Sequence, residues 1–76
     1  MKAAAQLLNQ AIRSELNTGY DAVRLAKKAY KIYHEYCSEL DSELDGIFLQ
    51  IIAMEEGEEF EFSEVEIKAI ADQLTH

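Results

Sequence analysis

The chain has 76 residues, one cysteine, no proline and a net charge of −8, so it can form one small domain at most, without a disulfide framework. An acidic chain is a poor general nucleic-acid binder, because that binding depends on neutralising phosphates. The apolar runs are too short for a signal peptide or a membrane span, so we expect one cytoplasmic domain over residues 1–76, with no nucleic-acid or membrane partner.

The first predicted element is a helix from about Lys2 to Leu16. Ala5, Leu8 and Ile12 precede Leu16 at steps of 3, 4 and 4, which places all four on one helical face. Alanine and leucine also favour helices intrinsically. The pattern therefore predicts an amphipathic N-terminal helix.

A short link is predicted to end this helix. Asn17 or Gly19 can adopt the left-handed conformation that closes a helix, and Thr18 with Asp21 has the spacing of a capping box for the next one. So short a link predicts an antiparallel hairpin of the first two helices.

A heptad pattern dominates the middle of the chain. Its members alternate at steps of 3 and 4 and would share one face of a helix, the heptad seam: Val23, Ala26, Tyr30, Tyr33, Cys37, Leu40, Leu44, Ile47, Ile51 and Met54. Since the seam keeps its phase throughout, we predict one long helix over about residues 20–56. At 1.5 Å per residue it would be about 54 Å long.

An alternative arises between Ser38 and Gly46, where Ser-Glu-Leu-Asp occurs twice in tandem. Ser42 could cap a new helix and Asp45 could complete a capping box. The break near Ser42–Gly46 would then produce a four-helix bundle. We prefer the continuous helix because the seam crosses Gly46 without losing phase.

The C-terminal part contains one further helix. Gly57 is expected to end the long helix, and residues 58–62 are expected to form an extended link in which Phe60 and Phe62 hold the chain to the core. Ser63 and Glu66 have the spacing of a capping box for the final helix. Its apolar face comprises Ile67, Ile70, Ala71 and Leu74. The fold class is therefore all-α, a small helical bundle whose long central helix is flanked by an N-terminal and a C-terminal helix.

No chemical site emerges from the side chains. His34 and Cys37 are three residues apart and could share a metal, but a zinc site needs about four ligands and only His76 remains as a further nitrogen or sulfur donor. Cys37 lies on the seam, which favours a buried thiol. The central carboxylates match neither a calcium loop nor a di-iron motif. We therefore expect no catalytic residue, no metal and no cofactor, and a protein that is not an enzyme.

The first functional hypothesis is a non-enzymatic protein–protein interaction module, a small adaptor or regulatory protein acting as a helical homodimer. A long helix with a wide apolar arc offers more surface than two shorter helices can cover, which favours self-association. Tyrosines at the edge of an apolar face are common at interfaces. The expected interaction residues are Tyr30, Tyr33, Tyr36, Leu40, Leu44, Ile47 and Ile51.

The second hypothesis is an acidic inhibitor or nucleic-acid mimic that binds a basic cleft of a partner protein. Residues 1–34 carry six basic and two acidic side chains, whereas residues 35–76 carry one basic and thirteen acidic ones. This distribution would let the basic half lie near the acidic half if the chain folds back or if two chains pair antiparallel. An acidic inhibitor would instead use the glutamate-rich segment from Glu55 to Glu66 to occupy a basic cleft electrostatically. The residues expected to carry it are Glu55, Glu56, Glu58, Glu59, Glu61, Glu64 and Glu66.

Overall fold

The computed structural model describes residues 3–74, and every regular element in that range is helical. The four α-helices are α1 (Ala3–Thr18), α2 (Ala22–Tyr36), α3 (Ser42–Ile52) and α4 (Glu64–Leu74). Three short 3-10 turns lie between them: η1 (Cys37–Glu39), η2 (Ala53–Glu56) and η3 (Glu58–Phe60). The predicted all-α class is therefore confirmed.

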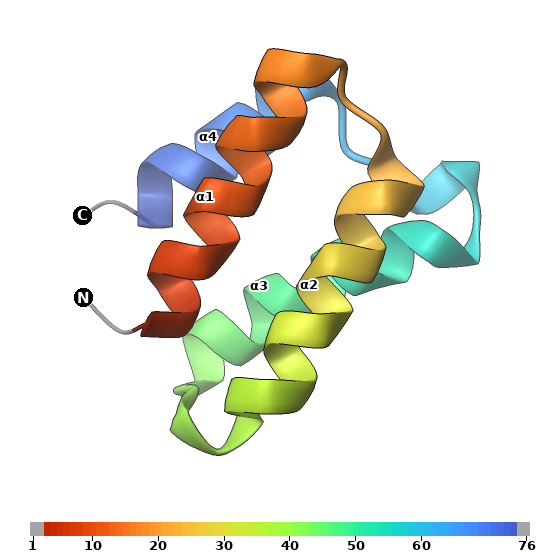
Figure 1. The fold of residues 1–76 in the computed structure, drawn as a ribbon. Coiled ribbons are helices and arrows are strands. Elements are labelled where there is room, and N and C mark those ends of the chain that lie inside the picture. Colours follow the sequence, from red (N-terminus) through yellow and green to blue (C-terminus); the bar gives the residue numbers. More distant parts are fainter. Residues whose placement is uncertain (1–2, 75–76) are drawn as a thin grey trace.

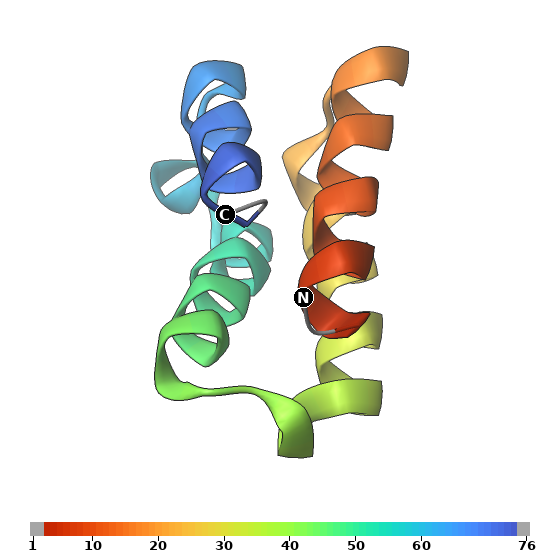
Figure 2. The same cartoon turned by 90° about the vertical axis from the view of Figure 1, so that its left-hand side faces the viewer.

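The helices form two layers, with α1 and α2 in one and α3 and α4 in the other (Figure 2). Helices α1 and α2 run antiparallel, as the short link predicted, while α4 packs on α1 and α3 packs on α2 (Figure 1). Among residues 3–74, the largest fully buried side chains are apolar except Glu15, and the apolar ones are Phe48, Leu8, Ile12, Leu25, Ile51, Met54 and Ile67. One core thus serves all four helices.

The first helix agrees with its prediction except at its ends. Lys2 lies outside the described residues, and the helix extends to Thr18. Gly19 has a φ of 100°, the left-handed conformation expected to close the helix. The cap of α2 is Asp21, whose Oδ1 accepts a hydrogen bond from the Arg24 amide at 3.1 Å. Thr18 was the wrong choice for this cap, since its hydroxyl donates back to the Ser14 carbonyl of α1 at 2.8 Å.

The long helix over residues 20–56 is wrong, because the chain turns back between α2 and α3. Helix α2 ends at Tyr36, η1 follows, and Leu40 is extended with φ −87° and ψ 133°. Asp41 caps α3 by accepting a hydrogen bond from the Leu44 amide at 2.8 Å. The four-helix alternative therefore describes the chain better, although the break precedes Ser42 and Gly46 lies inside α3.

The heptad seam keeps its phase from α2 into α3 although the two helices are not continuous. Helices α2 and α3 pack against each other, so each must present an apolar face to the other, whether or not they are joined. In α3 the seam residues Leu44 and Ile51 are indeed buried. The argument for a dimer from one long apolar helix loses its basis, because this face is largely covered within the chain.

In α2 the seam is displaced by about one residue from the buried face. Val23 and Tyr30 are exposed by 38% and 56%. Cys37, which follows α2, is exposed as well, so the prediction of a buried thiol is wrong. The buried positions of α2 are Ala22, Leu25, Ala26 and Ala29. Three of these four positions are alanines, so small side chains rather than the larger seam residues fill most of the buried face of α2.

The C-terminal helix agrees with the prediction, whereas the link before it does so only in part. Ile67, Ala71 and Leu74 are buried in α4. The link is not wholly extended, because η3 occupies Glu58–Phe60 and extended backbone resumes only at Glu61. Among the described residues, no helix combines the length and apolarity that crossing a membrane requires.

Candidate protein-interaction surface

The most strongly charged surface is the acidic segment, defined as residues 55–66. Its seven glutamates are all exposed, and the segment contains no lysine or arginine. Within the described residues 3–74, none of the seven forms an ion pair; the ion pairs there involve Glu15 and Asp72. Their negative charge is therefore not neutralised by the described part of the chain and is available to a partner.

The acidic segment is held against the start of α2. The Tyr20 hydroxyl donates a hydrogen bond to the Phe62 carbonyl at 2.8 Å and lies 3.4 Å from the Met54 sulfur. The Phe62 amide also donates to the Met54 sulfur, at 3.4 Å. Burial, followed by the nearby Glu61 carboxylate, raises the pKa of Tyr20 to about 12, so the hydroxyl stays protonated and keeps donating. The carboxylates thus project from a defined backbone.

Two apolar side chains are exposed within the same segment. Phe60 is 49% exposed and Val65 is 79% exposed. The expectation that Phe60 and Phe62 both hold the link to the core is therefore half right, because only Phe62 packs against it. Exposed aromatic groups beside charged ones are typical of surfaces that bind other proteins.

Glu66 has a structural role in addition to its charge. Its carboxylate accepts a hydrogen bond from the Ser63 amide at 2.9 Å, and the Ser63 hydroxyl accepts one from the Glu66 amide at 3.2 Å. This reciprocal pair is the predicted capping box, and it fixes the start of α4. A partner is therefore expected to use the preceding glutamates more than Glu66.

The tyrosine and seam residues lie mostly inside the fold. Leu44 and Ile51 are buried, and Tyr33, Tyr36, Leu40 and Ile47 are half-buried against the core, so only Tyr30 of this set is exposed. The Tyr33 hydroxyl donates to Asp45 at 2.7 Å, which raises the pKa of Tyr33 and joins α2 to α3. The structure thus brings these residues together in packing, and their interface role remains a prediction.

The sequence analysis did not anticipate a buried carboxylate at Glu15. Its side chain is fully inaccessible to solvent. It accepts hydrogen bonds from Arg24 Nε at 2.8 Å and Nη2 at 2.9 Å, from Lys28 Nζ at 2.7 Å and from the Asp21 amide at 3.2 Å. The signal in the sequence was a glutamate near the end of α1 facing basic residues four apart on α2, which a hairpin brings together.

The ion pairs of Glu15 with Arg24 and Lys28 determine which basic side chains of α2 remain available to a partner. Hydrogen bonding to Arg24, and less so to Lys28, outweighs burial and holds the pKa of Glu15 at about 2. Both cations are therefore engaged in joining α2 to α1. Helix α2 carries four lysine and arginine side chains, Arg24, Lys27, Lys28 and Lys31. Of these, Lys27 and Lys31 are left exposed and form no ion pair with a described residue.

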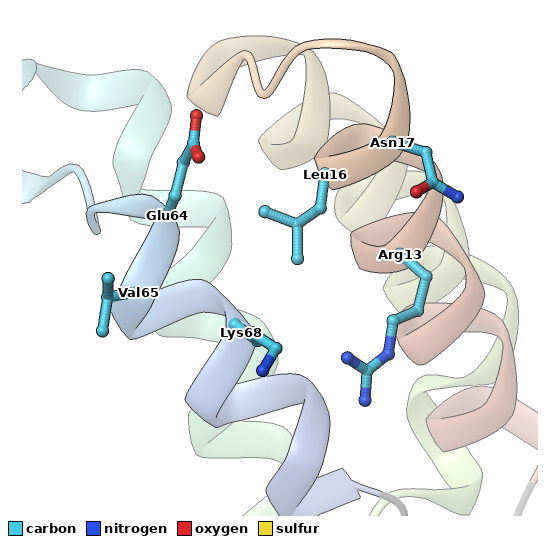
Figure 3. Close-up of a pocket in the computed structure, with 6 residues that line it drawn as sticks. All are labelled: Arg13, Leu16, Asn17, Glu64, Val65 and Lys68. Carbon is cyan, nitrogen blue, oxygen red and sulfur yellow. The ribbon is translucent and has the colours of Figure 1, made fainter.

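A groove lies between α1 and α4, with a volume of about 400 Å³. Leu16 and Arg13 reach into it from α1, and Val65 and Lys68 border it on α4 (Figure 3). Two cations, Arg13 and Lys68, line the groove. Arg13 forms an ion pair with Asp72 at 2.8 Å, so its charge is already neutralised. The groove is open to solvent.

Of the residues considered for metal binding or nucleophilic chemistry, His34 and Cys37 are exposed, and His76 lies outside the described residues. His34 is exposed on α2, and its ring centroid lies 6.3 Å from that of Tyr30. Cys37 is a free, exposed thiol in η1. Within residues 3–74, no three side chains among His, Cys, Asp and Glu gather closely enough to hold a metal ion.

Comparison with protein-family models, with curated proteins and with solved structures finds no match for this chain. The arrangement of its own charged and apolar side chains must therefore carry the functional argument.

Proposed function

We propose that this chain is a non-enzymatic protein–protein interaction module whose acidic segment binds a basic surface on a partner protein. The observation that supports this most is the set of exposed glutamates in residues 55–66, which have no ion pair with any described residue. Opposite charge brings partners together and orients them. The exposed Phe60 provides an apolar anchor within the same surface.

The test is affinity capture on immobilised chain with a matched charge control. We compare the wild type with a variant in which Glu58, Glu59 and Glu61 become glutamine. The control replaces Glu35, Glu39 and Glu43, which are equally exposed but lie outside the segment. We expect capture of a basic protein by the wild type and the control but not by the segment variant. Equal loss in both variants would contradict the proposal.

Ionic strength provides a second criterion for the same interaction. Surface charges are screened over about 10 Å at 0.1 M salt and about 3 Å at 1 M. Binding through the acidic segment should therefore weaken strongly between low and moderate salt. A captured protein that stays bound at high salt would be held mainly by apolar contacts, contrary to the proposal.

Nucleic-acid mimicry is a narrower form of the same function. In that case the basic surface on the partner would be one that normally holds phosphates, and the chain would act as an acidic inhibitor. The same seven glutamates would support it, since all are exposed within one short segment of the chain. Competition separates the two forms, because duplex DNA should displace the chain from a nucleic-acid-binding partner and leave any other partner in place.

A further inference from the structure

The exposed face of α2 complements the acidic segment in both charge and apolar character. Val23, Lys27, Tyr30 and His34 follow one another at steps of 4, 3 and 4, so they share one helical face, here called the outer stripe. All four are exposed, while the opposite face of α2 is buried. The outer stripe thus combines an unpaired cation with apolar and aromatic side chains.

A depression on the outer stripe has the chemistry to receive an aromatic ring. Its volume is about 420 Å³, and Tyr30, Lys31, His34 and Glu35 line it. The rings of Tyr30 and His34 form its aromatic wall, and Lys31 lies at its edge without an ion pair among the described residues. An aromatic side chain flanked by carboxylates would match this surface. Phe60, with Glu59 and Glu61 on either side, is such a side chain.

We propose that a second copy of this chain provides the basic surface to which the acidic segment binds. Phe60 of each copy lies in the depression beside Tyr30 and His34 of the other, and the adjacent glutamates face Lys27 and Lys31. This inference rests on the proposed function, since it names the partner of the acidic segment.

The positions of the two surfaces allow both contacts to form at once. The segment η2 contacts α2 and carries η3 to the end of the molecule where α2 begins (Figure 1). The depression lies toward the other end of α2, and the eight residues from Ala22 to Tyr30 rise about 12 Å along the helix at 1.5 Å each. In the proposed dimer the two copies of α2 are antiparallel, with the Phe60 of each beside the depression of the other. A two-fold axis makes the contacts equal and closes the assembly as a dimer.

The groove between α1 and α4 is a weaker match for the same segment. Arg13 is already paired with Asp72. A glutamate lines each of the two surfaces, Glu64 in the groove and Glu35 in the depression, so repulsion of carboxylates does not distinguish them. No aromatic side chain lines it. Its exposed cation Lys68 therefore provides a control for charge reversal outside the predicted interface.

The mass in solution tests the proposal with the full chain. We expect light scattering after size exclusion to report twice the chain mass of 8.7 kDa at high protein concentration. Lys27→Glu with Lys31→Glu should weaken dimerisation about tenfold or more, and Lys68→Glu should leave it unchanged. A wild type that stays monomeric at every concentration would overturn the inference, as would a dimer insensitive to the double reversal.

A matched pair of variants tests the apolar part of the proposed contact. Phe60→Ser should weaken the dimer, whereas Val65→Ser, at a more exposed position outside the contact, should not. Circular dichroism melting verifies that both variants fold. Equal mass for the folded Phe60→Ser variant and the wild type would contradict the proposed placement of Phe60.

A mixing experiment excludes loss of folding as the cause of dissociation. One variant carries Lys27→Glu and Lys31→Glu, and a second carries Glu59→Lys and Glu61→Lys. Each alone should be monomeric, because like charges then face each other in both contacts. Mixed together, they should form a heterodimer in which both contacts are restored. Failure of the mixture to dimerise would overturn the inference, while the capture experiment above would still test the acidic segment against other proteins.

Discussion

Replacing Glu15 with glutamine removes a charge from the centre of the α1–α2 contact while keeping the size of the side chain. The wild-type carboxylate accepts hydrogen bonds from Arg24, Lys28 and the Asp21 amide. The amide group of glutamine has only one acceptor oxygen, and its NH₂ group would face the two cations. We therefore expect Glu15→Gln to lower the free energy of unfolding.

The size of the loss follows from the pKa of the carboxyl group. It lies at about 2 in the folded chain, against an ordinary value of 4.5. At about 1.36 kcal/mol per pKa unit, this corresponds to about 3 kcal/mol. The side chains of Arg24 and Lys28 are half-exposed, and solvent screens such pairs. A loss of about 1–2 kcal/mol is therefore expected, in a domain whose total stability should be about 4–11 kcal/mol.

The assay is denaturant unfolding of wild type and Glu15→Gln as a function of pH. Because folding lowers the pKa of Glu15, its contribution is fully present above about pH 4.5 and declines as the pH falls toward 2. The difference between the two proteins should be constant from pH 5 to 7 and disappear near pH 2. Glu35→Gln, at an exposed position, serves as the control and should change little. A difference that is absent at neutral pH, or that persists unchanged in acid, would refute the reasoning.

Three further predictions concern single side chains. Tyr20→Phe should lower the free energy of unfolding by about 1 kcal/mol, because the hydrogen bond to the Phe62 carbonyl is lost. Since burial raises the pKa of Tyr20 to about 12, the stability of the wild type should also fall between pH 10 and 12. Equal alkaline unfolding curves for the two proteins would contradict this. Because Asp41 caps α3, Asp41→Ala should lower the free energy of unfolding, measured by urea titration, by about 1 kcal/mol. Ser42→Ala should change it little. A larger loss for Ser42→Ala than for Asp41→Ala would mean that the cap is misassigned. Phe48→Ala should lower the free energy of unfolding by about 3–5 kcal/mol, a large part of the total, and should therefore lower the melting temperature measured by circular dichroism. A cooperative melt close to that of the wild type would show that the ring is not central to the core.

Local signals predicted most of the helices but not the turn between α2 and α3. Helix ends depend on a few nearby residues, so Gly19 and the Ser63–Glu66 pair were identifiable in advance. The turn at residues 37–41 contains neither glycine nor proline and depends on packing between α2 and α3, which are joined only through it. A heptad phase identifies a shared face and does not distinguish one long helix from two helices that fold against each other.

The sequence predicted the charge of the candidate surface but not which basic side chains of α2 are paired within the fold. The glutamates of residues 55–66 were expected to form an acidic surface, because residues 35–76 carry thirteen acidic side chains and only one basic one. The capture of Arg24 and Lys28 by Glu15 was not expected, since it depends on how α1 is rotated against α2. That rotation also decides that Tyr30 faces outward while Tyr33 faces the core.

The two-layer arrangement gives the molecule a large electric dipole moment. Among the described residues, 3–36 carry five basic and three acidic side chains in the layer of α1 and α2, and 37–74 carry one basic and twelve acidic ones, mostly in the other layer (Figure 2). In the field of a charged partner such a molecule experiences a torque before any contact forms. Encounters then begin with the acidic layer turned toward a basic surface, so a larger fraction of collisions is productive at low salt.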